Sequence, residues 1–156
     1  MDAIEINKLD PNFKYEVASH PGGEAVKSCF ACGACTGGCP ASDVDAAYDP
    51  RKIIRMVLLG MKEKVLSSDI IWLCSTCYTC SFHCPQDVKF VKVMSVLRQM
   101  AAKEGYVSPS FLNSVSEIDR FSQLVRHHMV MAIVDKKKES TAIDPKAVLK
   151  QVSEKL

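Results

Sequence analysis

All eight cysteines of the chain fall in two short runs that share one spacing. The first run is CFACGACTGGCP, residues 29–40, and the second is CSTCYTCSFHCP, residues 74–85. Both read C-x2-C-x2-C-x3-C-P, and every cysteine of the first run has a counterpart 45 positions later. Thiolates are ligands for soft metal ions and for iron–sulfur clusters, so the repeated spacing indicates metal ligation.

Three kinds of thiol chemistry compete for these runs. Disulfides are disfavoured, because bridges between such close cysteines close only short loops and gain little stability. Structural zinc is also disfavoured, because four-thiolate zinc sites usually combine two separated pairs of ligands. A pair of [4Fe–4S] clusters is the interpretation we favour, since the spacing is that of bacterial two-cluster ferredoxins.

In that pattern the fourth cysteine of each run ligates the cluster of the other run. The predicted ligands of the first cluster are Cys29, Cys32, Cys35 and Cys84. The predicted ligands of the second cluster are Cys74, Cys77, Cys80 and Cys39. We therefore expect a reciprocal arrangement that holds two clusters close enough for electrons to pass between them.

The residues between the ligands differ in the two runs. Glycine and alanine in the first run allow positive φ and a close approach of backbone donors to sulfur. Aromatic side chains accompany the second run, and we expect Trp72, Tyr78 and Phe82 to cover its cluster, with His83 partly exposed near it and not a ligand. Because solvent access affects reduction potential, the two clusters should differ in potential.

Composition excludes several classes of function. A formal net charge of +2 is too small to indicate nucleic-acid binding or an acidic membrane surface as partner. No apolar run is long enough to cross a bilayer, and the segment MDAIEINKLD does not resemble a signal peptide. We expect a cytoplasmic protein, in which thiols serve more often as metal ligands than in disulfides. No catalytic residue is predicted, because ligation uses every cysteine.

Helices are expected to position the two runs. Asp49 should begin a helix that ends near Gly60, and Ser68 or Asp69 should cap a short helix before Cys74. Asp87 should open the clearest helix, which Gly105 closes. Its expected apolar face comprises Phe90, Val93, Met94, Leu97 and Ala101, and its expected exposed face comprises Lys89, Lys92, Arg98 and Gln99.

The remaining segments complete the predicted organisation. A weaker helical stripe starts at Ser108, the apolar run MVMAIV occupies residues 129–134, residues 135–141 should form a linker, and residues 145–156 should form a terminal helix. No alternating pattern of paired strands stands out. The predicted fold is mainly α, an α-helical ferredoxin architecture around two [4Fe–4S] clusters. We expect an N-terminal extension (1–22), a two-cluster domain (23–105) and a C-terminal helical extension that docks a partner (106–156).

The chain resembles the C subunit of the heterodisulfide reductases of methanogens and their bacterial relatives. The segments CFACGACTGGCP, DPRKIIRMVLLG and SSDIIWLCSTCYTCSFHCPQDV carry the resemblance, which covers roughly residues 10–105. It implies an electron-transfer subunit of anaerobic, methanogenesis-related metabolism with no active site of its own. It also implies two partners, a flavin-containing A-type subunit and a catalytic B-type subunit that reduces a disulfide.

Other functions remain open at this point. The chain could be the iron–sulfur subunit of another dehydrogenase complex, although 28 cysteine-free residues before Cys29 leave no room for a [2Fe–2S] domain. It could also be a free ferredoxin-like carrier, although its near-neutral charge and extra helices favour permanent docking. Identity of the co-purifying proteins would separate these hypotheses.

Overall fold

The computed structural model describes residues 6–134 and 144–154, and helices are the only regular secondary structure in these ranges. The α-helices are α1 Phe13–Ser19, α2 Ala34–Gly37, α3 Pro40–Val44, α4 Pro50–Leu58, α5 Lys62–Leu66, α6 Thr79–His83, α7 Phe90–Lys103, α8 Pro109–Val134 and α9 Pro145–Ser153. Three short 3-10 helices are η1 Ile6–Lys8, η2 Glu24–Ser28 and η3 Asp69–Trp72. The mainly α fold predicted from the sequence is confirmed.

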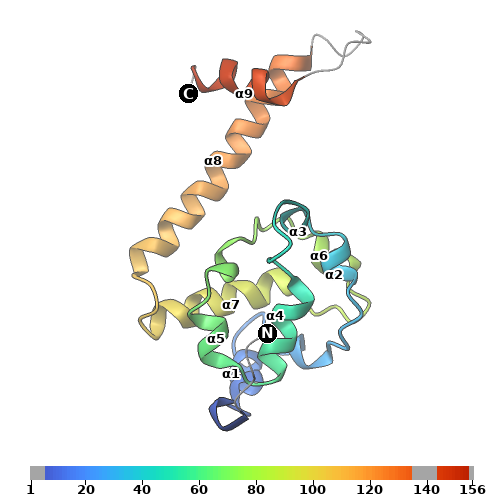
Figure 1. The fold of residues 1–156 in the computed structure, drawn as a ribbon, viewed down its shortest axis with the longest axis vertical. Helices are drawn as coiled ribbons and strands as arrows, with labels where there is room; N and C mark the ends of the chain where they lie inside the picture. Colours follow the sequence, from blue (N-terminus) through green and yellow to red (C-terminus); the bar gives the residue numbers. More distant parts are fainter. Residues whose placement is uncertain (1–5, 135–143, 155–156) are drawn as a thin grey trace. The chain divides into compact units, whose positions relative to one another are not determined.

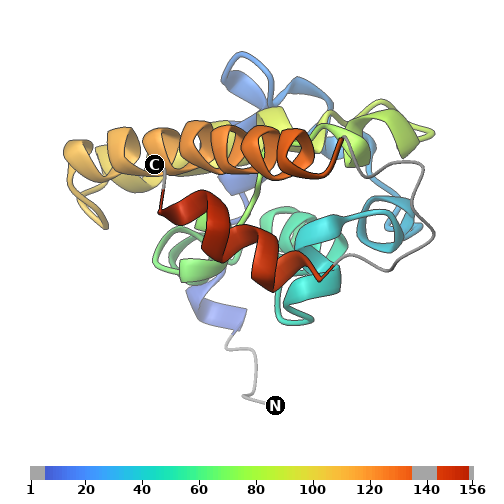
Figure 2. The same cartoon turned by 90° about the horizontal axis from the view of Figure 1, so that it is seen from above.

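The chain divides into two compact units, Met1–Leu112 and Asn113–Leu156. The first unit contains α1 to α7 and both cysteine runs (Figure 1). In the second unit, α9 folds back alongside the C-terminal half of α8 (Figures 1 and 2). The run MVMAIV belongs to α8, whereas the predicted linker 135–141 lies outside the described residues. None of the described helices combines the length and apolarity that a membrane span requires.

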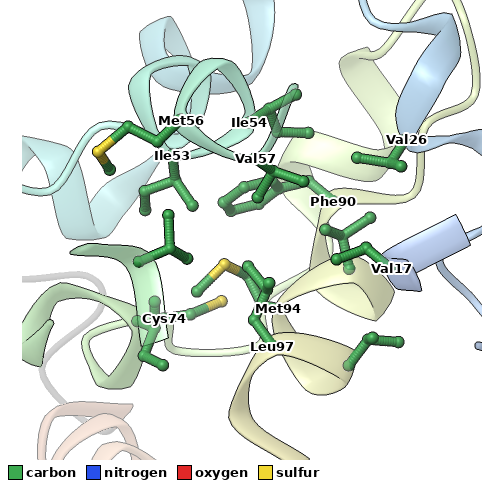
Figure 3. Packing of buried hydrophobic residues seen from close by; sticks show 14 of the residues in the cluster. Val17, Val26, Ile53, Ile54, Met56, Val57, Cys74, Phe90, Met94 and Leu97 are labelled. Carbon is green, nitrogen blue, oxygen red and sulfur yellow. The ribbon is translucent and has the colours of Figure 1, made fainter. Parts of the chain in front are cut away.

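A hydrophobic core in the first unit supports the two cysteine runs. Phe13 and Val17 of α1, Ile53 and Val57 of α4, and Leu97 of α7 are fully buried. Figure 3 shows Cys74 lying among the core side chains, next to Met94 and Leu97. The second cysteine run is therefore attached directly to the core.

Helix α4 begins at a cap that also connects it to the first cysteine run. The Asp49 carboxylate accepts hydrogen bonds from Lys52 N at 3.1 Å and from Thr36 Oγ1 at 2.6 Å. Burial would raise the pKa of Asp49, but these two hydrogen bonds outweigh burial and lower it. Pro50 occupies the first helical position, where a missing N–H has no cost. The predicted start of this helix at Asp49 is confirmed.

Gly60 ends α4 in a conformation that only glycine adopts easily. Its φ is +79°, and an added Cβ would lie 2.2 Å from the carbonyl oxygen of Asp10. The backbone N–H of Asp10 also donates to the Gly60 carbonyl at 2.7 Å. This close approach fixes the segment before α1 against the end of α4.

An ion pair at Lys62 joins three helices of the first unit. Its Nζ lies 2.8 Å from Glu16 Oε2 of α1 and 2.7 Å from Glu104 Oε1, just after α7. Burial would lower the pKa of Lys62, but the hydrogen bonds to Glu104 and Glu16 raise it overall. The start of α5 is thereby tied to the helices on either side.

Two expectations for α7 need correction. The helix begins at Phe90 rather than at Asp87, because Asp87 and Lys89 both take positive φ (49° and 54°). The predicted apolar face is buried as expected. Arg98, however, is predicted on the exposed face and is only 8% exposed. The core wraps further around α7 than the helical period indicates, since Val96 and Met100 are buried too.

We predict that Asp49→Ala lowers the free energy of unfolding by about 1–2 kcal/mol, because it removes the cap of α4 and the acceptor of Thr36. Asp49→Asn keeps an acceptor oxygen at the cap and should lose much less. Urea unfolding followed by circular dichroism under anaerobic conditions would compare the two variants. Equal losses in both would show that the capping bonds contribute little.

Candidate iron–sulfur site

The two cysteine runs lie on loops that end in the short helices α2 and α6, and these two helices pack against each other (Figure 1). All eight cysteines are free thiols. Cys39, Cys74 and Cys80 are buried, Cys32 and Cys77 are exposed, and the other three are half-buried. The fold thus brings together two cysteine runs that lie 45 residues apart in the sequence, as reciprocal ligation of two clusters requires.

The sequence repeat is also a repeat of backbone conformation. Ala31 and Thr76, at equivalent positions, have φ of +59° and +51°. Gly33 and Tyr78, two residues further on, have φ of +88° and +63°. Positive φ is uncommon for residues other than glycine and costs conformational energy, so such residues tend to mark functional loops. Glycine predicts this turn only in the first run, because Thr76 and Tyr78 carry no such signal.

One group of cysteines, here called the first site, lines a cavity between the runs. Cys29, Cys32 and Cys35 of the first run and Cys84 of the second run line this cavity, and Cys80 also borders it. Ile54, Val88 and Phe90 contribute apolar walls. Backbone N–H groups of Ala31 and Val88 donate to the sulfurs of Cys29 and Cys84, each at 3.4 Å.

The second site comprises Cys39, Cys74, Cys77 and Cys80. The pKa of Cys80 rises to about 11, first because the thiol is buried and then because charges on the other three thiols lie close to it. Burial would raise the pKa of Cys77, but hydrogen bonds from the hydroxyl and N–H of Thr79 lower it overall. Cys39 comes from the first run, so this site also mixes the two runs.

Two buried hydroxyl groups test whether the second site suits a cluster. Tyr48 Oη and Ser81 Oγ are buried, and neither has a hydrogen-bond partner among the described residues. The thiol of Cys74 lies next to the Tyr48 hydroxyl without meeting the geometry of a hydrogen bond to it. Buried hydroxyls normally have partners, and the sulfur atoms of a cluster would accept from them. The residues present therefore fit a [4Fe–4S] group.

A single metal ion places different demands on its ligands. Within residues 6–134 and 144–154, no three His, Cys, Asp or Glu side chains are grouped closely enough to bind one ion. A [4Fe–4S] cluster takes four thiolates, each on its own iron atom, and so needs them spread around a larger body.

The two runs approach each other closely at Gly38. A Cβ on Gly38 would lie 2.6 Å from Nδ1 of His83, which belongs to the second run. His83 itself is exposed, as expected for a residue near a cluster that does not ligate it. The contact explains why the first run has glycine directly before Cys39.

The expectation that aromatic side chains cover the second run is wrong for most of them. Phe82 is 88% exposed and Tyr78 is 58% exposed. Only Trp72 is half-buried, with its ring packed edge-on against Phe111 at 4.9 Å between centroids. Cover for the second site comes instead from Tyr48 and from the core.

Arg98 is a residue near the second site that sequence reasoning missed. Its side chain donates to the carbonyl oxygens of Ile71, Trp72 and Cys74 at 2.8, 3.0 and 2.9 Å. The three acceptors belong to the segment that leads into the second run. The helical period places Arg98 on the outer face of the helix, so no signal in the sequence indicates this role.

Comparison with known proteins agrees with this site. Residues 25–88 match the family model of the 4Fe-4S dicluster domain, so two [4Fe–4S] clusters are the cofactors of the chain. The chain is 40% identical over 132 residues to the iron-sulfur C 2 subunit of the CoB–CoM heterodisulfide reductase of Methanocaldococcus jannaschii, covering 80% of this chain and 70% of that protein.

Two further relatives have related names. The C2 subunit of the H2/formate:CoB-CoM heterodisulfide,ferredoxin reductase of Methanococcus maripaludis is 46% identical over 67% of this chain and 58% of its own length. The C subunit of the H2:CoB-CoM heterodisulfide,ferredoxin reductase of Methanothermobacter thermautotrophicus is 38% identical over 69% of this chain and 57% of its own length. The alignments thus span between 57% and 70% of these three relatives.

We predict that Gly38→Ala lowers the free energy of unfolding by up to about 1 kcal/mol, because the added methyl group overlaps the exposed His83 ring and forces it into another rotamer. His83→Ala alone should have little effect, since the ring is exposed. The double variant should recover most of the loss, as measured by urea unfolding under anaerobic conditions. A double variant as unstable as Gly38→Ala would contradict this explanation.

Proposed function

The chain belongs to the family of heterodisulfide reductase C subunits, and from this we propose that it relays single electrons between a flavin-containing subunit and a catalytic subunit that reduces a disulfide. Its relatives carry names of heterodisulfide reductase subunits, and its own dicluster domain makes it an iron–sulfur electron-transfer subunit. The proposal places the complex in the cytoplasm. The observation that supports it most is the mixing of both cysteine runs in two adjoining sites that share Cys80 as a neighbour.

The proposed ligand sets are those expected from the spacing. The first site would use Cys29, Cys32, Cys35 and Cys84, and the second site Cys39, Cys74, Cys77 and Cys80. When bound, each cluster supplies one-electron redox chemistry. The chain's own residues hold the two sites side by side, donate hydrogen bonds to sulfur, and exclude water from one side with the core.

Each proposed ligand set has one exposed cysteine, Cys32 in the first site and Cys77 in the second. The exposed cysteines give each site an edge at the protein surface, where a partner can approach. Phe30 and Tyr78, which follow Cys29 and Cys77 in the chain, are also exposed and provide apolar contact area beside these edges. We infer that electrons enter at one site and leave at the other.

The C-terminal extension 106–156 is proposed to dock a partner subunit, beside a two-cluster domain at 23–105 and an N-terminal extension at 1–22. Helix α8 contains no buried residue, and its exposed side chains include Phe121 and Met131. Val125, Met129, Ile133 and Val148 line an apolar groove between α8 and α9. An apolar groove between two helices suits the apolar face of a third helix, which we assign to the partner.

We predict a reciprocal result for the exchanged ligands. Cys39→Ser should disturb the cluster at the second site, and Cys84→Ser should disturb the cluster at the first site. Iron analysis and electron paramagnetic resonance of each variant would identify the affected cluster, with Cys32→Ser and Cys77→Ser as references for the two sites. Damage from Cys39→Ser that matches the Cys32→Ser reference would contradict crossed ligation.

We also predict that the protein purified anaerobically from its native source carries a flavin protein and a second iron–sulfur protein with it.

In the full chain, Val130→Glu places a charge in the apolar groove between α8 and α9 and should weaken the association with these partner proteins at least tenfold, with iron content unchanged. Ile6→Glu, at an exposed position in the first unit, is the matched control. A native protein that elutes alone near its 17.2 kDa chain mass would instead favour a free carrier.

A further inference from the structure

Arg98 carries a buried positive charge next to the second site. The residue is 8% exposed, and its guanidinium donates three hydrogen bonds, all to backbone carbonyls. One acceptor is the carbonyl of Cys74, a proposed ligand, at 2.9 Å from Nη2. The guanidinium also lies 5.7 Å from the centre of the Trp72 ring.

This charge has no carboxylate partner in the part of the chain that the structure describes. Hydrogen bonds to neutral carbonyls use three of the five N–H donors of the guanidinium but leave its net charge uncompensated. A buried ion is costly unless an opposite charge lies near it. The segment bound by Arg98 leads directly into Cys74, Cys77 and Cys80, three of the four thiolates of the second site.

A second polar group faces the same site from α4's side of the fold. Tyr48 is 1% exposed, and its hydroxyl has no hydrogen-bond partner among the described residues. A tyrosine hydroxyl carries its proton at neutral pH, so this unpartnered group is available as a donor to sulfur.

We propose that Arg98 and the Tyr48 hydroxyl stabilise the reduced form of the cluster at the second site and so raise its reduction potential. Reduction adds one electron and no proton, so the site becomes more negative by one charge. A fixed positive charge and a hydrogen-bond donor both favour that more negative form. This inference rests on the proposed ligand sets.

The first site provides a natural contrast. Arg51 borders its cavity and supplies the same formal charge, but Arg51 is exposed. Water screens an exposed charge far more than a buried one. The two sites thus differ in how strongly a neighbouring arginine acts on them, and this difference separates their potentials along the relay.

The test is an anaerobic redox titration with dithionite as the electron donor, followed by electron paramagnetic resonance on the full chain. Spectra of Cys32→Ser and Cys77→Ser assign the signals to the first and second sites. Tyr48→Phe should lower the midpoint potential of the second-site cluster only. Arg98→Met should lower it further, Arg98→Lys should lower it less than Arg98→Met, and Arg51→Met should leave it unchanged.

Tyr48→Phe keeps the ring and removes only an unpartnered oxygen, so this variant should fold and bind about eight irons per chain, the content of two [4Fe–4S] clusters. Unchanged potentials in a fully loaded Tyr48→Phe protein would overturn the role of the hydroxyl. Equal shifts at both clusters in Arg98→Met, or equal loss of the cluster in Arg98→Met and Arg98→Lys, would mean that Arg98 acts only through folding. Neither result contradicts the proposed electron-relay function. That function would be contradicted by a different result, an unmodified protein that binds only one cluster.

Discussion

Close packing of the two cysteine runs is the constraint on which the rest of the structure depends. The runs meet at Gly38 and His83, where a single added methyl group would overlap the ring. Each run turns through positive φ at the same two positions, so the loops present their thiols in matching ways. Because neither run alone gathers four thiols in one place, the sites exist only when 45-residue-separated segments are brought together.

The hydrophobic core holds the two cysteine runs in place by joining the helices to which they are attached. Asp49 fastens the first run to α4 through Thr36, and Arg98 fastens the approach to the second run to α7 through three carbonyls. Helices α4 and α7 in turn bury Ile53, Val57 and Leu97 in one cluster of side chains. Each run thus has its own polar attachment to a helix, and the apolar core joins the two helices.

The sequence predicts those structural features that depend on residues close together in the chain, such as helix caps. The cap at Asp49 and the cap at Ser68 depend on residues within a few positions, and both are confirmed. The prediction that Asp87 begins a helix is wrong, because the backbone of Asp87 and Lys89 has positive φ. Neither residue type indicates this conformation in the sequence. The predicted cover over Tyr78 and Phe82 is absent, since burial depends on segments distant in the chain.

The burial of Arg98 could not be predicted from the sequence, because it depends on contacts with distant segments. Its helical position predicts exposure, and its partners lie 24 to 27 residues earlier in the chain. The same side chain lies over Trp72, and Trp72 packs against Phe111 in the first turn of α8. These contacts form a continuous path within the first unit from the backbone of Cys74 to the start of α8. The start of α8 is therefore held by the same side chain that holds the approach to the second cysteine run.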